Sequence, residues 1–106
     1  MLLVNGEELT IERIEKVFAQ YRIPQYMADG TYNYLHYGVK PGSFLSAVIC
    51  NDLRGAVENA DDNNGRCLVN WVKFFYNHCP AGSWGSLETM KKWQEERRTI
   101  CESTMR

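Results

Sequence analysis

The chain has 106 residues, of which 44% are hydrophobic and 12% aromatic. This length and composition predict a single domain over residues 1–106 with one buried core, and they exclude a disordered chain. The 12 basic and 13 acidic side chains leave a formal net charge of −1. Because general nucleic-acid binding depends on many basic groups that neutralise phosphates, this balance argues against it, and equally against an acidic mimic of DNA.

The beginning of the chain and the cysteines indicate where the protein acts. The first residues, MLLVNGEELT, lack the charged and hydrophobic regions of a signal peptide, and no run of 18 apolar residues follows. We therefore expect a cytoplasmic protein that does not cross a membrane. The spacing of Cys50, Cys67, Cys79 and Cys101 matches no metal-binding pattern. We expect reduced thiols, no structural metal and no cofactor, with disulfides as the alternative in a secreted chain.

The first part of the chain contains signals for a hairpin and a helix. Residues 2–4 are apolar and precede Asn5 and Gly6, a typical hairpin turn. From Thr10, a typical N-cap residue, apolar side chains recur with the spacing of one helix face. These side chains are Ile11, Ile14, Val17, Phe18 and Tyr21. We expect residues 1–23 to add an N-terminal helix to the domain, with a short hairpin before it.

Two further helices are predicted before a polar loop. The second covers residues 25–37 and ends at Gly38, and the third begins with the cap residue Ser43 and continues to about residue 60. Residues 61–65, DDNNG, predict a loop because such residues tolerate positive φ angles. The apolar positions of the third helix predict its buried face. They are Leu45, Ile49, Leu53, Ala56, Val57 and Ala60.

The fourth helix, residues 66–78, is predicted to be central. Its polar side chains occupy one narrow stripe, namely Arg66, Asn70, Lys73 and Asn77. The remaining sides are apolar, which predicts that other helices surround it and that Trp71 and Phe74 are buried. A fifth, peripheral helix follows the cap residue Ser86 and ends near Cys101. The predicted fold is an all-α, compact bundle of four to five helices around residues 66–78.

Two residues in these helices suggest chemistry. Asp52 projects near Leu45 on the third helix, so we expect it at the edge of the core, where a carboxylate needs hydrogen-bond donors or a cation. Its structural interpretation is an acceptor for a nearby helix start, such as the Ser86 region, or for an indole N–H, and its functional interpretation is a recessed acid or ligand anchor. His78 lies on the apolar side of the fourth helix and precedes Cys79. Because adjacent helical residues diverge, we expect a hydrogen-bonded histidine rather than a Cys–His nucleophile.

The second helix has a polar and aromatic stripe. Asp29, Asn33 and His36 share one face, and Tyr32 and Tyr37 lie near it. Two potential ligands are too few for a zinc site. The stripe is either an ordinary solvated face or a surface for non-covalent binding, for which tyrosines are well suited.

Trp84 stands in an otherwise small and flexible stretch, PAGSWGS. It either anchors the fifth helix to the fourth or is displayed for a partner, and we favour the anchor. Trp84 could also form the aromatic wall of a polar pocket, with Asn51, Asp52 and Asn77 as its polar side chains. The sequence contains no phosphate-binding glycine loop, no G-x-S-x-G and no H-E-x-x-H pattern, and these absences weaken an enzymatic interpretation.

Several short motifs occur in a fixed order. The stretches PGSFLSAVICNDLRGAVENADDNN and LVNWVKFFYNHCPAGSWGSLETMKKW contain P-G-x-F-L-x-A-V, N-D-L, A-D-x-x-N, Y-N-x-x-P and W-G-S-x-E. Between about Pro24 and Trp93 the chain resembles a group of small proteins of tailed phages and prophages that share this series. The group provides no activity to carry over. The resemblance implies a phage-derived protein that acts inside a bacterial cell.

These observations lead to one functional hypothesis and two alternatives. The first is a non-enzymatic accessory protein that binds and inhibits a host protein, including a factor of antiviral defence. The alternative is a sponge that sequesters a nucleotide-type signalling molecule. A small enzyme that uses Asp52 or His78 is the second alternative. The predicted ligand- or partner-binding residues are Tyr32, Asn33, His36, Tyr37, Asn51, Asp52, Asn77 and Trp84.

Overall fold

The computed structural model describes the backbone of residues 2–104 and the side chains of residues 2–102. It begins with an antiparallel hairpin of β1 (Leu3–Val4) and β2 (Glu7–Glu8), in which Leu3 faces Glu8 and Val4 faces Glu7. Asn5 and Gly6 have φ angles of 53° and 81°, as a two-residue turn with right-handed strand twist requires. The predicted hairpin is therefore confirmed.

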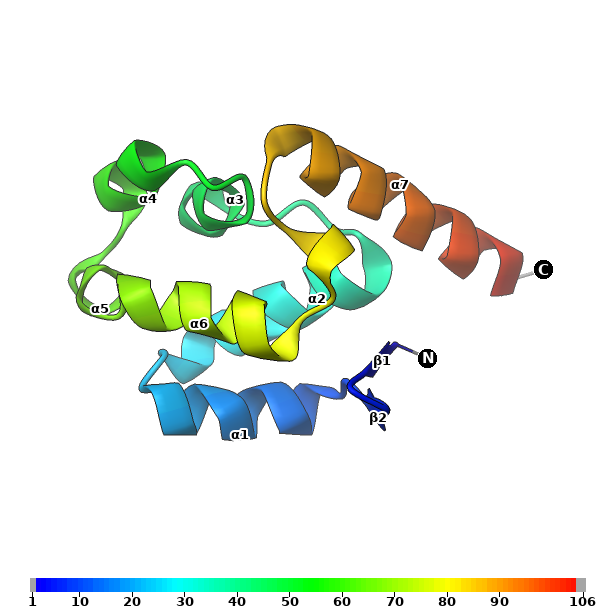
Figure 1. Ribbon diagram of the computed structural model, residues 1–106, viewed down its shortest axis with the longest axis horizontal. Coiled ribbons are helices and arrows are strands. Elements are labelled where there is room, and N and C mark those ends of the chain that lie inside the picture. Colours follow the sequence, from blue (N-terminus) through cyan, green and yellow to red (C-terminus); the bar gives the residue numbers. More distant parts are fainter. Residues whose placement is uncertain (1, 105–106) are drawn as a thin grey trace.

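The rest of the described chain is helical. Seven α-helices follow in order: α1 (Ile11–Tyr21), α2 (Ala28–Tyr37), α3 (Ser43–Ile49), α4 (Leu53–Asn59), α5 (Asp62–Arg66), α6 (Leu68–His78) and α7 (Leu87–Thr104). Two short 3₁₀ turns, η1 (Gln25–Met27) and η2 (Ala81–Ser83), precede α2 and α7. In Figure 1, α1 lies beside α6 along one edge, and α7 lies at the opposite edge. The compact helical fold is confirmed, although the helices outnumber the four or five expected.

Three helix ends lie at the residues that the sequence predicted, namely the starts of α1 and α7 and the end of α2. The hydroxyl of Thr10 accepts a hydrogen bond from the backbone N–H of Arg13 at 3.2 Å, and the hydroxyl of Ser86 accepts one from Thr89 N–H at 3.1 Å. Gly38 ends α2 with a φ of 71°. A Cβ there would lie 2.6 Å from the backbone oxygen of Gln94 in α7. Glycine thus provides both the left-handed turn and the close approach of α7.

The core forms around one face of α6. Trp71, Phe74 and Phe75 are fully buried, which confirms the prediction for the first two. Phe18 of α1 meets the rings of Trp71 and Phe74 edge to face, at centroid distances of 5.2 and 5.0 Å, a favourable geometry for aromatic pairs. Lys73 is exposed, as expected. Asn70 is half-buried because its side-chain amide donates to the backbone oxygen of Tyr21 at 2.8 Å.

The predicted continuous helix over residues 43–60 is wrong, because the chain breaks it into α3 and α4. Asn51 adopts a left-handed φ of 60°, which asparagine tolerates better than most residues. Asp52 then begins α4 as its N-cap. The predicted cap at Ser43 is also wrong, since Gly42 is the N-cap and provides no side-chain hydrogen bond. The break turns Leu53 and Val57 outward, so their predicted burial is wrong, whereas Leu45 and Ile49 are buried.

The predicted loop over residues 61–65 is a short helix instead. The carboxylate of Asp61 accepts from the backbone N–H of Asn64 at 2.7 Å and caps α5. The side-chain oxygen of Asn64 in turn accepts from the indole N–H of Trp71 at 3.0 Å. This polar sequence therefore folds as a helix. Its side chains accept hydrogen bonds from a backbone N–H in the first turn and from the N–H of a buried indole in α6.

The expectation that helices surround α6 is wrong. Val69, Val72 and Tyr76 are 67%, 42% and 77% exposed. Their spacing of three and four residues places them on one face, opposite the aromatic core. One side of α6 is buried and the other faces solvent.

Candidate functional site

The aromatic residues predicted on α2 do gather. The rings of Tyr32 and His36 lie 4.7 Å apart, and Tyr37 lies 6.0 Å from Tyr32 and 5.4 Å from His36. Burial, and then a hydrogen bond with Tyr37, raises the pKa of Tyr32. Asn33 is half-buried on the same helix. The stripe is thus an aromatic cluster in which the Tyr32 phenol stays protonated at neutral pH.

Arg97 of α7 supports this cluster from the interior. It is only 7% exposed, its Nε donates to the backbone oxygen of His36 at 2.8 Å, and its guanidinium lies 5.8 Å from the centre of the Trp93 ring. Burial, followed by the charge of Arg97, lowers the pKa of His36. His36 is therefore held neutral at neutral pH and contributes an aromatic surface rather than a charge. No sequence pattern indicated that Arg97 is buried.

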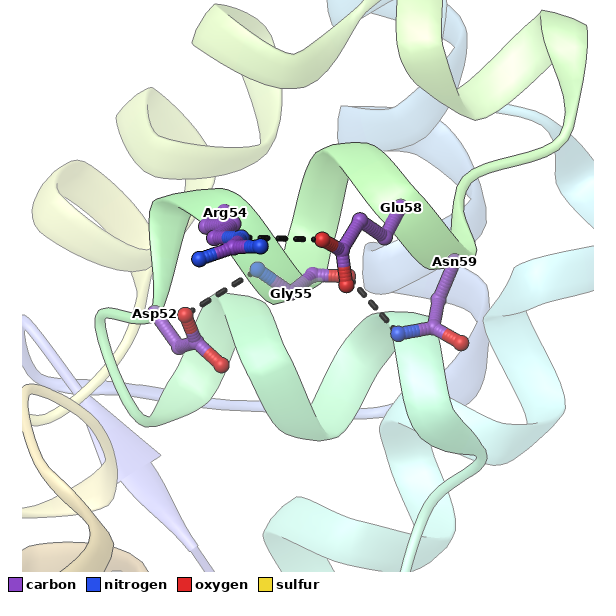
Figure 2. A network of polar contacts seen from close by, with 5 residues as sticks. All are labelled: Asp52, Arg54, Gly55, Glu58 and Asn59. Carbon is purple, nitrogen blue, oxygen red and sulfur yellow. Dashed lines mark hydrogen bonds and ion pairs between the residues drawn. The ribbon is translucent and has the colours of Figure 1, made fainter.

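Asp52 is not at the edge of the core, and that prediction is wrong. Its side chain is exposed and accepts from the backbone N–H of Gly55 at 3.0 Å, as Figure 2 shows. The donor is the start of its own helix, not Ser86 or an indole. A Cβ at Gly55 would collide with the Asp52 carboxylate. Asn51, beside it, is exposed in its left-handed conformation. These contacts identify Asp52 as a helix cap.

Further polar contacts join side chains of α4 to each other and to the backbone of the same helix. Arg54 pairs with Glu58 at 3.0 Å, and the amide of Asn59 donates to the backbone oxygen of Gly55 at 2.8 Å (Figure 2). The Arg54 and Glu58 charges therefore balance each other on the outer surface of α4.

His78 is a hydrogen-bonded residue, as expected. Its Nε2 lies 3.1 Å from the hydroxyl of Tyr21, and its ring stacks on Phe74. Burial, with a further contribution from Arg13, lowers the pKa of His78. Burial also raises the pKa of the Cys79 thiol well above its usual range. A protonated, buried thiol is a poor nucleophile, so this pair gives a Cys–His mechanism no geometric support.

The residues suggested for a polar pocket have different neighbours. The side-chain amide of Asn77 lies 3.4 Å from the Tyr21 hydroxyl, and its backbone oxygen accepts from Asn5. Trp84 is half-buried, with its ring centre 5.8 Å from that of Phe75 in α6. It thus packs on the central helix, as the anchor interpretation expected. Asn51 and Asp52 instead line a small hollow beside α4.

The structure reveals an apolar surface that the sequence interpretation missed. It consists of five exposed side chains: Leu53, Val57, Val69, Val72 and Tyr76. Leu53 of α4 and Val72 of α6 line one hollow of about 40 Å³. Helical spacing places Val57 beside Leu53, and Val69 and Tyr76 on the same face of α6 as Val72. We call it the α4–α6 surface. It was missed because apolar periodicity marks a face without saying whether another helix covers it.

Comparison with protein-family models, curated proteins and solved structures gives no match. Within the described part of the chain, no three histidine, cysteine, aspartate or glutamate side chains are grouped so that they could hold a metal ion. Among the described helices, none is both long and apolar enough to cross a membrane. The fold and the exposed surface therefore define only a class, a small helical protein with an uncovered apolar face.

Proposed function

We propose that the protein acts without catalysis, by binding a protein of the bacterial cell through the α4–α6 surface and inhibiting it. The exposure of Leu53, Val57, Val69, Val72 and Tyr76 carries this proposal. Scattered exposed apolar residues are ordinary, but a grouped set on two neighbouring helices is typical of a binding surface. Burial of such a set against a partner provides the main favourable term of association.

The shape of the surface favours a partner with a projecting aliphatic side chain. The hollow between Leu53 and Val72 has walls of small apolar residues, Ala47 and Ala56 among them. Its volume of about 40 Å³ suits the end of one aliphatic side chain rather than a whole ligand. One inserted anchor, surrounded by flatter contacts that exclude water, is the usual arrangement of an interface hot spot.

The charges around the surface favour a partner of low local charge. Two acidic groups, Asp52 and Glu58, and two basic groups, Arg54 and Lys73, are exposed on α4 and α6 or at their ends. Arg54 and Glu58 already pair with each other. A balanced rim gives no steering toward strongly acidic or basic surfaces. The resemblance to phage and prophage proteins supports a bacterial host protein as the partner, including one of antiviral defence.

The contacts of Asp52 and His78 also favour a non-catalytic function. Asp52 caps α4, and His78 is hydrogen-bonded to Tyr21. Each side chain therefore has a structural explanation that needs no catalytic role. The aromatic cluster of Tyr32, His36 and Tyr37 provides a second, smaller contact area on α2.

The test places a photo-crosslinking amino acid at Val69 in bacterial cells that express the full chain. The matched control carries it at Gln20, an exposed position of α1. We expect one host protein to be captured from position 69 and not from position 20. The captured protein, once purified, should bind the wild-type chain and lose its own activity on binding.

Substitutions then separate specific binding from capture alone. Val69→Asp and Leu53→Asp should each weaken binding of the purified partner at least tenfold, because each buries a charge in an apolar interface. Gln20→Asp should leave binding unchanged, and circular dichroism should show that all three variants are folded. Binding that neither surface variant weakens contradicts the proposal. So does capture of a second copy of this chain from position 69, because the surface would then serve self-association.

A further inference from the structure

A second surface feature lies away from the α4–α6 surface. An open cleft of about 740 Å³ separates the turn after α1 from the junction of α5 and α6. The cleft is lined by Pro24, Cys67 and six residues with longer polar side chains, namely Arg22, Gln25, Tyr26, Asn63, Arg66 and Asn70. Its volume falls in the range of small-molecule sites. The cleft thus differs in chemistry from the apolar surface.

Two arginines line this cleft. Arg22 and Arg66 are both exposed, and neither forms an ion pair with a carboxylate in the described part of the chain. Asp62 lies one turn before Arg66 on α5 and does not pair with it. Guanidinium groups bind phosphate oxygens with two parallel hydrogen bonds. Two unpaired arginines that line one cleft are therefore suited to a phosphorylated ligand.

Tyr26 provides an aromatic wall. It is 60% exposed and lines both this cleft and a neighbouring hollow beside α3, so its ring stands between the two. Its hydroxyl donates to the carboxylate of Asp61, and this hydrogen bond raises the pKa of Tyr26. The phenol therefore stays protonated and its ring is held in place. The acidic Asp61 also accepts from Asn64 N–H, so both of its oxygens are engaged outside the cleft.

Hydrogen bonds connect the opposite walls of the cleft. Asn70 of α6 donates to the backbone oxygen of Tyr21 at the end of α1, and Tyr26 of η1 donates to Asp61 at the start of α5. Arg22 itself has a φ of 58° and ends α1. The walls are thus fixed before any ligand arrives. A fixed site loses less conformational entropy on binding than a mobile one.

Amide groups remain available for a heterocycle. Asn63 is exposed, and its side chain lies within hydrogen-bonding range of the Tyr26 hydroxyl. Gln25 uses its amide nitrogen to bind the backbone of Glu15, which leaves its amide oxygen as an acceptor. Asn70 similarly retains its side-chain oxygen. Donors and acceptors of this kind recognise the polar edges of nucleobases.

We propose that this cleft binds a nucleoside phosphate, with the base against Tyr26 and the phosphate on Arg22 and Arg66. The site is independent of the α4–α6 surface, so either proposal can fail without the other. It also uses none of the residues that the sequence analysis predicted for a ligand or partner. The positive φ of Arg22 and the short helix α5, which place the two arginines on one cleft, were both absent from that prediction.

Calorimetric titration of the full chain tests the site. The probes are AMP, GMP, ADP and GDP, with adenosine, guanosine and inorganic phosphate as comparisons. We expect at least one nucleotide to bind, and both its nucleoside and inorganic phosphate to bind at least tenfold more weakly. The affinity should fall as the salt concentration rises, because salt screens the arginine–phosphate attraction.

Variants locate the binding. Arg22→Gln and Arg66→Gln should each weaken it at least tenfold, and Tyr26→Ala should weaken it while Tyr26→Phe retains the ring contact. The matched control is Arg98→Gln, on the exposed side of α7. Thermal unfolding should show that all variants are folded. The proposal is overturned if no nucleotide binds at millimolar concentration, if inorganic phosphate binds as tightly, or if the Arg22 and Arg66 variants bind like wild type.

Discussion

The paired helices α1 and α6 and the segment from α3 to α5 are held together in different ways. In α1 and α6, two helices of 11 residues meet through buried aromatic rings such as Phe18 and Phe74. The α3–α5 segment consists of helices of 7, 7 and 5 residues. Asp52 and Asp61 cap two of them. The first region depends on apolar burial. In the second, α3 is buried as well, whereas α4 and α5 each bury a single residue and depend more on local hydrogen bonds, so Leu53 and Val57 of α4 stay exposed.

The largest expected effect comes from removing a buried ring between α1 and α6. Phe74→Ala removes a fully buried ring that contacts Phe18 and Trp71, and it should lower the free energy of unfolding by about 3–5 kcal/mol. Urea denaturation followed by far-ultraviolet circular dichroism measures this change. Tyr76→Ala, two residues away on the exposed face of α6, is the control and should cost less than about 0.5 kcal/mol. Equal losses in the two variants would refute the assignment of the faces.

A smaller effect is expected in the second region. Asp52→Ala leaves the N–H of Gly55 without its side-chain acceptor, and it should lower the free energy of unfolding by about 1 kcal/mol. Asp52→Ser restores an acceptor and should recover most of this loss. Urea denaturation measures the free energy of unfolding of each variant. An Asp52→Ala protein as stable as wild type would show that the cap contributes nothing.

The smallest effect depends on pH and belongs to the first region. Burial lowers the pKa of His78 in the folded protein, so the unfolded chain binds more protons as the pH falls through about 6.5, the ordinary histidine value. The contribution of neutral His78 to the free energy of unfolding is therefore fully present above that pH. It is lost as the pH falls through the lowered pKa of the folded protein. Wild-type stability should fall between pH 7.5 and 5.5, and His78→Gln should show a smaller fall. A larger fall in the variant would contradict this sign.

Much of the fold could be predicted from the sequence, because the signals were local. Thr10 and Ser86 begin helices as cap residues, Gly38 ends one, and the aromatic side of α6 forms the core. The hairpin turn at Asn5 and Gly6 was equally visible. Each of these features depends on a residue type and its immediate neighbours.

The rest required information about the packing of distant residues. Asn51 and Asp52 are compatible with a helix interior, and only the fold shows that they end one helix and begin another. The DDNNG stretch forms a helix because Asn64 reaches Trp71. Among the candidate residues, the α2 aromatic cluster was predictable from helical spacing. The α4–α6 surface and the Arg22–Arg66 cleft were not, since both depend on which elements remain uncovered.

The hydrogen bond between Asn64 and Trp71 has a spectroscopic consequence. It joins a fully buried indole to α5, the helix that contributes Asn63 and Arg66 to the cleft. Indole fluorescence and near-ultraviolet circular dichroism both respond to the hydrogen bonding and packing of the ring. Trp71 is therefore a built-in optical reporter on the position of α5, and a ligand that shifts this helix changes the signal without any added dye.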